Sequence, residues 1–400
     1  MFKIVRFPKK LNKFFDNFKT GFRFNHFDYF KEFVLLMAFS FGNKNVSSLY
    51  RHLDTEKHRT RFNNFLNKGR WDPEKELKKK ALEILKSLNP QKGEKIYLIV
   101  DDSKKKKRGK TMDAVGKILD CTNMKFTYGH QYVTAILWFR GHIIPWGIRL
   151  YVKKEHCKDL NQTFKKTTEI AAELIEEFKI SKDIKTVVLF DAFYLCKTVV
   201  KSCRRKNFKF ISVMSSNRNL FRGGRKLRIK KYARNKFYRS EKRTSKNKKY
   251  RYTNPEKFQT TGLGSLNVIF SKKNKENQIL TLVTDDFKIG GETLLDTYEK
   301  RWMIEVFFKD TKQLLGLGQY QNASLKAAVT HLHLVCFSFA LLTHIKIDCE
   351  KDKKLKAKKM STANLQNKLR QIVWHDLVDH LKNKEPDSMI KELDRLLIAA

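Results

Sequence analysis

Acidic residues stand at three places in the chain where they could hold a metal ion. Asp101 and Asp102 follow a short apolar run at residues 96–100, and Asp191 follows a second run of the same kind. Short apolar runs predict buried strands, so these carboxylates are expected at strand ends. A further acid, Glu305, lies in a stretch with helical spacing. Carboxylate oxygens are the ligands that Mg²⁺ prefers, so this ordered set is a candidate metal site.

The residues around Glu305 form a polar stripe. Arg301, Glu305 and Lys312 fall on one side of a helix, with Tyr298 one turn earlier. Taken alone, Arg301 and Glu305 could be a solvated i, i+4 pair worth roughly a few tenths of a kcal/mol. Much of the remaining circumference is apolar, which predicts that the helix packs into a core; these residues are Trp302, Ile304, Val306, Phe307 and Phe308.

Together these residues resemble a known family. Tyr298, Arg301, Glu305 and Lys312 fit the Y-x2-R-x3-E-x6-K signature of the IS4-like DDE transposases, which include the Tn5, Tn10 and IS701-type enzymes. The likeness runs over about residues 97–344. It implies an α/β fold with an RNase H-like catalytic core, in which a mixed sheet with flanking helices is interrupted by a mostly β insertion. An N-terminal helical bundle and C-terminal helices would complete the chain. The implied activity is cleavage of DNA at terminal inverted repeats and strand transfer to target DNA.

The resemblance also implies which residues do the chemistry. Asp102, Asp191 and Glu305 would hold two Mg²⁺, which Mn²⁺ could replace, and the ions would stabilise charge on the attacking and leaving oxygens of a phosphodiester. Asp102 takes the first position because the family reads acidic, Asp, hydroxyl here, with Ser103 as the hydroxyl. Neighbouring strand residues point to opposite faces, so Asp101 stays open as the alternative ligand.

Phosphate binding is expected beside these acids. In the family the Tyr, Arg and Lys of the signature grip phosphate near the 5′ end of the transposon strand, and the resemblance carries this role to Tyr298, Arg301 and Lys312. The basic run at residues 104–110 could line the DNA path or be a mobile charged loop. The residues singled out there are Lys104, Lys105 and Arg108.

The overall charge favours a nucleic-acid partner. The chain has 85 Lys and Arg against 41 Asp and Glu, a formal net charge of +44, and such a protein repels itself unless it binds a polyanion. A lysine-rich genome could inflate this charge on solvated faces. Residues 222–250 hold 14 Lys or Arg against the single acid Glu241. We expect this block to contact DNA, above all through Arg225, Arg228, Lys230 and Lys231.

Hydrophobic periodicity and turn signals divide the 400 residues into five segments. Residues 1–93 are expected to be helical and to bind DNA, with a helical cap on the main domain as the alternative. The RNase H-like core is expected at residues 94–216 and 292–347. A basic, mostly β insertion is expected at 217–291, and a charged spacer with C-terminal helices at 348–400.

Individual elements follow from the same patterns. A turn at Arg140 and Gly141 should join two strands of a hairpin. Helices are predicted at residues 29–41, 62–66, 74–88, 164–178, 192–206, 298–312, 323–345, 362–382 and 387–399. Strands are predicted at residues 96–100, 131–139, 143–150, 186–190, 208–213, 266–271 and 278–284.

Other features narrow the function. The six cysteines show no CxxC pair and no matching His pair, which argues against a zinc site and a disulfide framework. No stretch reaches the roughly 18 apolar residues of a membrane span, so we expect no membrane partner and a bacterial, cytoplasmic, nucleoid-associated protein. His130 is expected to be a core histidine, and Asp285 and Asp286 are expected in a turn or cap.

The partners and the rival functions follow from the resemblance. Joining two transposon ends requires that both be held together, so a homodimer on double-stranded DNA is expected. No Trp lies between Trp146 and Trp302, which leaves open whether a DNA hairpin intermediate forms. The alternatives are an RNase H-like nuclease or resolvase without strand transfer, and an inactive DNA-binding relic.

Overall fold

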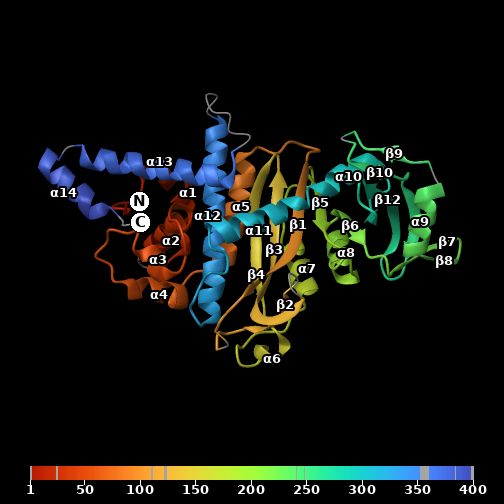
Figure 1. Ribbon diagram of the computed structural model, residues 1–400, viewed down its shortest axis with the longest axis horizontal. Helices are drawn as coiled ribbons and strands as arrows, with labels where there is room; N and C mark the ends of the chain where they lie inside the picture. Colours follow the sequence, from red (N-terminus) through yellow and green to blue (C-terminus); the bar gives the residue numbers. More distant parts are fainter. Residues whose placement is uncertain are drawn as a thin grey trace.

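The structure, a computed structural model, describes residues 2–23, 26–109, 111–120, 124–239, 241–246, 248–351, 360–382 and 384–397 (Figure 1). At its centre a mixed sheet has β3 antiparallel to both of its long neighbours, β4 and β1, whereas β1, β5 and β6 run parallel. This arrangement confirms the expected RNase H-like core. The strands, in spatial order, are β4 (His142–Tyr151), β3 (Lys125–Phe139), β1 (Lys95–Lys106), β5 (Lys185–Phe190) and β6 (Lys209–Met214).

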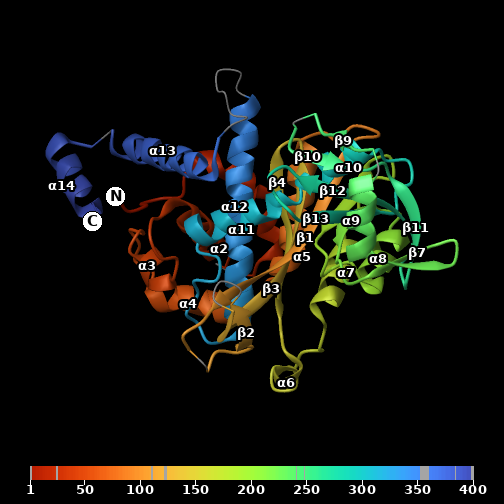
Figure 2. The same ribbon diagram turned by 45° about the vertical axis from the view of Figure 1, so that its right-hand side comes forward.

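Helices cover both faces of this sheet. Helix α11 (Trp302–Leu314) crosses one face over β1 and β3, and α7 (Thr167–Glu176) with α8 (Lys197–Arg205) lies on the other (Figures 1 and 2). Burial on both faces explains why the parallel strands read as continuous apolar runs. The sequence also places the sharp turn between β3 and β4 correctly. Arg140 and Gly141 have φ angles of 45° and 84°, the left-handed values of the hairpin turn that matches strand twist.

The predicted insertion extends the same sheet. Strand β13 (Ile279–Thr284) pairs antiparallel with β6, and β12 (Gly264–Lys273) pairs with β13, as the predicted hairpin requires. The sheet therefore continues without a break from the core into the basic block. Its remaining elements are β11 (Glu256–Thr260), β7 (Asn219–Arg222), β8 (Arg225–Arg228), β10 (Tyr250–Tyr252), β9 (Arg243–Thr244) and the covering helix α9 (Ile229–Arg239).

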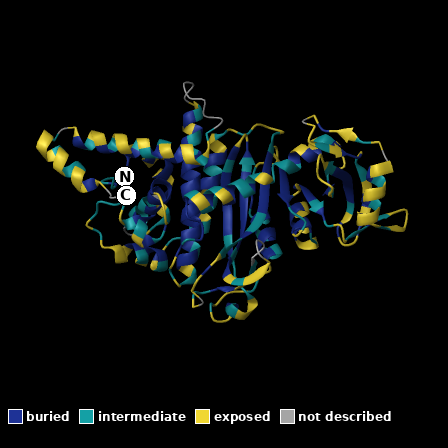
Figure 3. Cartoon of the chain, in the orientation of Figure 1, coloured by how far each residue is buried: buried dark blue, intermediate teal, exposed yellow. Residues whose placement is uncertain are grey.

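The long helix α12 (Leu325–Lys351) is the centre of the helical half of the molecule. It packs on β4 and on α2, α4 and α5, and its burial is visible in Figure 3. Among the described residues it is the one helix long and apolar enough to cross a membrane, so the expectation that no stretch reaches that length was wrong. However, 83% of its most apolar window is buried inside the fold, which is the environment of a core helix.

The N-terminal helices share this core instead of standing apart. The Ser338 hydroxyl donates to the Val34 carbonyl at 3.0 Å, and Phe337 contacts the rings of Phe18, Phe30 and Trp71. These helices thus cap the main domain, and their binding to DNA stays a prediction. The elements are η1 (Lys9–Leu11), α1 (Asn12–Phe15), η2 (Asp16–Gly21), α2 (His26–Phe39), α3 (Val46–Tyr50), α4 (Arg59–Lys68) and α5 (Pro73–Ser87).

Two helices follow the core at the C-terminal end. Helix α13 (Thr362–Leu381) is held against the body where Gln366 donates to the Ala38 carbonyl at 2.9 Å, and α14 (Pro386–Leu396) follows it. The charged spacer predicted from residue 348 begins as the last turn of α12, and residues 352–359 lie outside the described residues. The end of the last predicted helix, at residues 398–399, lies outside them as well.

Phe337 provides a test of this shared core. Replacing Phe337 with alanine should lower the free energy of unfolding by about 3–5 kcal/mol, because the side chain is fully buried among three rings of the N-terminal segment. Chemical denaturation followed by circular dichroism measures the change. Phe287→Ala, at a side chain that is half exposed, is the matched control and should change the free energy by less than about 0.5 kcal/mol. Equal losses in the two variants would contradict the shared core.

Candidate active site

The first pair of acids lies inside a strand and not at its end. Parallel pairing of β1 with β5 stops at Ile99 and Leu189, but β1 continues along β3 as far as Lys106. Asp101 and Asp102 therefore sit just beyond the parallel part of the sheet. The prediction of a strand ending at the acids was wrong because antiparallel pairing with β3 supplies the backbone partners that β5 no longer provides. Lys104 and Lys105 belong to this strand, so a mobile loop is excluded for them.

Asp101 faces helix α11. Its Oδ2 accepts a hydrogen bond from Arg301 Nη1 at 3.0 Å. Two residues further along the strand, Ser103 Oγ accepts one from Lys312 Nζ at 2.6 Å. Because alternate strand residues share a face, these two contacts fix the face of β1 that α11 covers.

Asp102 points to the opposite face. Its Oδ2 accepts a hydrogen bond from Gln131 Nε2 at 2.8 Å, and its Oδ1 accepts one from the Tyr194 hydroxyl at 3.1 Å. Tyr194 comes from the connection between β5 and α8, and α8 lies on the side of the sheet away from α11 (Figures 1 and 2). The two neighbouring aspartates are therefore held by different elements.

Asp191 lies at the end of β5, where the sequence predicted it. Its Oδ1 accepts backbone N–H groups of Phe193 at 3.0 Å and Tyr194 at 3.3 Å, an Asx-type turn that fixes the carboxylate. This turn delays α8 to Lys197, later than its predicted start at residue 192. Through Tyr194, the backbone turn around Asp191 is connected to the side chain of Asp102.

The signature helix is divided at Arg301. Helix α10 (Gly291–Glu299) carries Tyr298 and ends before Arg301, and α11 carries Glu305. At the junction the N–H groups of Lys300 and Arg301 bond to carbonyls three residues back, a tightening that turns the chain between the two helices. The single continuous helix predicted at residues 298–312 was wrong for this reason.

Arg301 lies between two acids. Besides Asp101, its guanidinium contacts Glu305 Oε1 at 3.5 Å from Nη1 and at 3.4 Å from Nη2. The predicted i, i+4 pair thus exists, but its arginine side chain is only 19% exposed and is shared with a third residue. Tyr298 is half-buried, and its pKa is raised to about 12, chiefly by burial.

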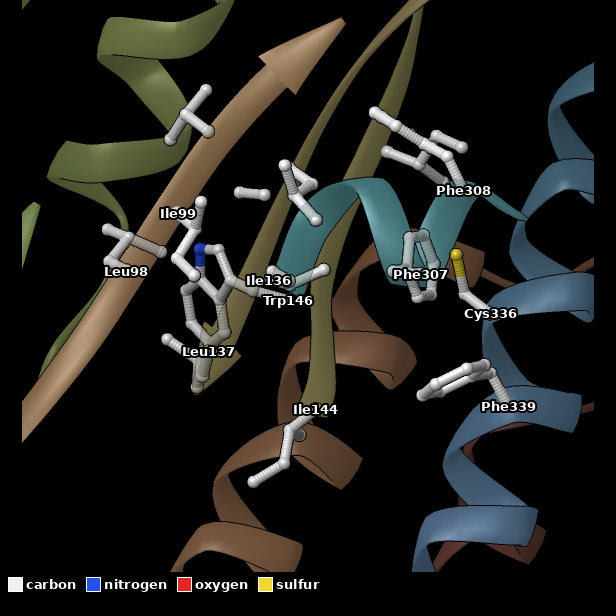
Figure 4. Packing of buried hydrophobic residues seen from close by; sticks show 14 of the residues in the cluster. Leu98, Ile99, Ile136, Leu137, Ile144, Trp146, Phe307, Phe308, Cys336 and Phe339 are labelled. Atoms are coloured by element: carbon white, nitrogen blue, oxygen red, sulfur yellow. The ribbon is translucent and has the colours of Figure 1, made fainter. Parts of the chain in front are cut away.

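Other residues of the signature helix lie as the apolar pattern predicts, with one exception. Phe307 packs on Phe339 of α12 with ring centroids 4.9 Å apart, beside Cys336 (Figure 4). Ile304 and Phe308 are buried as well. Trp302 is 61% exposed, so its predicted place in the core was wrong. As the first residue of α11 after the turn, it projects away from the face that packs on the sheet.

The negative charges around Arg301 affect one another. Burial and the charge of Asp191 raise the pKa of Asp101 to about 7, although Arg301 opposes the shift. Burial also raises the pKa of Asp191 above its ordinary value; the N–H groups of Tyr194 and Phe193 oppose this shift, and the charge of Asp102 adds to it. These carboxylates are harder to ionise because their negative charges lie close together. A bound cation would stabilise their charged forms.

The donor chemistry fits a divalent metal. Asp101, Asp102, Asp191 and Glu305 offer hard oxygen ligands, and three or four carboxylates suffice for Mg²⁺ ions that keep several waters. Within the described ranges, no three His, Cys, Asp or Glu side chains are gathered closely enough to hold an ion. The guanidinium between Asp101 and Glu305 accounts for part of this separation.

The predicted DNA-binding residues fall into two groups. Lys312 lies at the acids, and Lys105 adds a positive charge beside it. Lys230 lines a cavity of about 720 Å³ that also includes Ala192, next to Asp191. The other residues lie away from the acids: Arg108 is exposed after β1, Arg225 and Arg228 lie on β8 at the far end of the sheet, and Lys231 is exposed on α9.

Sequence reasoning missed the residues that hold Asp102 in place. Gln131 and Tyr194 carry no signal of this role, because each is an ordinary residue in or beside a strand. Predictions outside the site were better: His130 is buried, with its ring bonded to the Tyr320 hydroxyl and the Asp113 carbonyl. Asp285 likewise caps a strand by accepting the Phe210 N–H at 3.1 Å.

A family model described as DDE superfamily endonuclease matches residues 27–265, which include both aspartates of β1 and Asp191. No curated protein matched the chain.

The raised pKa of Asp101 predicts a pH-dependent stability. With a pKa of about 7 when folded and about 3.9 when unfolded, Asp101 binds its proton more tightly in the folded chain, so its contribution to stability falls as pH rises from 4 to 7. Asp101→Asn removes this loss. The free energy of unfolding of Asp101→Asn, minus that of the unmodified protein, should rise from pH 4 to pH 7 by an amount on the order of a few kcal/mol and then level off. Denaturation in chelator at several pH values measures it; a difference independent of pH would contradict the shift.

Proposed function

We propose that this chain, which belongs to the DDE superfamily of endonucleases, is a transposase that cuts DNA at terminal inverted repeats and joins the ends to target DNA. The observation that carries the proposal is the contact set around Arg301. There an acid of β1 and the acid of α11 share one guanidinium, close to Asp191 at the end of β5.

The coarser part of this function follows from the family. An endonuclease domain supports a nuclease-type enzyme with DNA as its substrate, and DDE superfamily endonucleases generally use divalent metals. The transposase activity, the recognition of inverted repeats, the IS4-like grouping and strand transfer are our proposal. They are supported by the Tyr298, Arg301, Glu305 and Lys312 signature.

Within the site we assign the first acid to Asp101 and keep Asp102 as the alternative. Glu305 lies on α11, and the α11 face of β1 carries Asp101, Ser103 and the Lys312 contact. Asp102 is directed to the other face, where Gln131 and Tyr194 already occupy its two oxygens. The contacts therefore favour Asp101, Asp191 and Glu305 as the acids that act together.

These three acids would hold two Mg²⁺ ions, or Mn²⁺ in their place, which when bound stabilise charge on the attacking and leaving oxygens. Arg301 would then be released from Asp101 and Glu305 and become free to bind a phosphate with its fork of donors. Lys312, whose ammonium donates to the Ser103 hydroxyl, adds a point charge on the same face. Tyr298, one turn before Arg301, would complete the phosphate grip.

Charge on the rest of the surface supports long DNA contacts. Lys230 and Arg234 of α9 line the cavity that also includes Ala192, so basic residues extend from Asp191 into the insertion. We propose that DNA follows this path, that two subunits hold the two ends together, and that the protein acts in the bacterial cytoplasm at the nucleoid. A nuclease or resolvase without strand transfer is the second candidate, because the matching family is described as endonucleases.

Cleavage of a labelled duplex that carries the element's own terminal repeats tests the proposal. In Mg²⁺ or Mn²⁺ the unmodified protein should cut at the repeat end, whereas Asp191→Asn and Glu305→Gln should lower the rate by at least about a hundredfold while still binding DNA. Asp101→Asn should match these two variants, and Asp102→Asn should keep more activity. The joining of cut ends to a plasmid, followed in the same reaction, separates a transposase from a nuclease.

Each failure has a distinct meaning. Binding without cutting by the unmodified protein would leave a DNA-binding relic. Cutting that survives in Asp191→Asn and Glu305→Gln would show that these are the wrong acids. Loss of cutting in Asp102→Asn but not in Asp101→Asn would return the ligand role to Asp102.

Lys312 should strengthen DNA binding by a similar amount whatever the base sequence of the duplex. Lys312→Ala removes one phosphate contact, so the slope of log affinity against log salt should become shallower by about 1 for any duplex. Fluorescence anisotropy at several salt concentrations measures the slope. Lys346→Ala is the matched control, since Lys346 donates to the Gly141 carbonyl away from the acids and should leave the slope unchanged. An unchanged slope in Lys312→Ala would contradict the phosphate contact.

A further inference from the structure

The hairpin formed by β2 (Gly116–Asp120) and the first residues of β3 carries apolar side chains in solvent. Met124 is 70% exposed, Phe126 is 74% exposed and Tyr128 is 36% exposed. Figure 3 shows the exposed residues of this hairpin at the lower edge of the sheet. Single exposed apolar residues are ordinary, but a cluster of this kind on one short hairpin marks a contact surface.

The hairpin continues the face that carries Asp101. Phe126 and Tyr128 alternate in phase with His130 and Tyr132 of the same strand. The rings of those two residues contact Tyr320, just after α11, and Phe308 of α11. The apolar cluster is therefore an outward extension of the surface on which Asp101, Ser103 and Lys312 lie.

The surroundings of the cluster are strongly basic. Residues 104–128 contain eight Lys or Arg and two acids, although one of the lysines, Lys107, is buried and donates to the Gly318 and Tyr320 carbonyls. One of the acids, Asp113, is directed inward, because its Oδ2 accepts the Leu325 N–H at 2.8 Å. Lys106, Lys117 and Lys125 are exposed on the strands beside the cluster, and Lys117 lies directly opposite Tyr128.

This combination fits duplex DNA better than a protein partner. Lysine is depleted at the centres of protein interfaces, whereas architectural DNA-binding proteins combine basic residues with apolar wedges that enter between base steps. We propose that Met124 and Phe126 form a wedge that enters the stacked bases of duplex DNA lying on the face of Asp101 and kinks it there. The proposal rests on the proposed function, because it requires DNA on that face.

The strand register sets where the wedge acts. Thr134 pairs with Asp101 across the sheet, and Phe126 lies eight residues before it on β3. At ~3.3 Å a residue this separation is about 26 Å, or about eight base pairs of duplex. The kink should therefore lie within about eight base pairs of the scissile phosphate, and at that full distance if the DNA axis follows β3.

Fluorescence energy transfer across an end-labelled duplex tests the wedge. The full-length protein is bound in chelator to a duplex of about 20 base pairs, which is longer than the separation above and keeps the two ends about 70 Å apart, within the range of energy transfer. Kinking should bring the two labels closer together. Phe126→Ala should bind about tenfold more weakly and bend the duplex less, because the lost base contact is a stacking contact, while the salt slope stays unchanged. Phe126→Trp should restore both properties. Ile390→Ala, at an exposed apolar residue of α14, is the matched control and should behave as the unmodified protein.

The outcomes separate the wedge from the function on which it rests. If the unmodified protein binds and bends DNA but Phe126→Ala does the same, the wedge is refuted and the proposed function stands. If Phe126→Ala changes the oligomeric state without DNA, the hairpin is a contact between copies of this chain and the wedge is likewise refuted. No binding by the unmodified protein would refute both. A bend that depends on Phe126 in a protein that cuts no DNA would support the wedge alone.

Discussion

The alternation of side chains along β1 constrains the whole candidate site. Moving by one residue carries a carboxylate from the face of α11 to the face of α8. Arg301 engages only one of the two neighbours, and Gln131 with Tyr194 engages the other. The face of the candidate site is thus defined by a strand, by the helix laid across it and by the turn that aims Arg301. A shift of β1 by one residue against β3 would exchange the two aspartates and dismantle every one of these contacts.

The continuous sheet gives this site its surroundings. Because β13 pairs with β6, the basic insertion is attached through backbone hydrogen bonds and not through a flexible linker. The spacing between the acids and the cations of α9 is therefore set by strand separation, which varies little among proteins. A surface built in this way suits a rigid, extended polyanion. At the opposite edge, the β2–β3 hairpin is likewise an outgrowth of the same sheet.

The amino-acid sequence was sufficient to predict most helices and strands, because their hydrophobic patterns lie within the segments themselves. Apolar runs located β5 and β6, and helical spacing located α5 and α12. Features that depend on distant partners were not predictable. Residues 101–106 look like the start of a charged loop, and only pairing with β3 makes them a strand. The turn at Arg301 and the exposure of Trp302 depend on how α10 and α11 pack on the sheet. The spacing of apolar residues within these two helices does not predict that packing.

The packing of α12 affects how the protein is made. The Ser338 to Val34 hydrogen bond joins residues 304 positions apart, and the apolar sides of the first helices face α12. A ribosome adds about 5–20 residues each second, so those helices wait on the order of tens of seconds for their partner. During that time their apolar surface is open to chaperones and to aggregation. A chain released before residue 325 would lack α12 altogether, so the N-terminal helices have no partner for their apolar sides until translation has passed this helix.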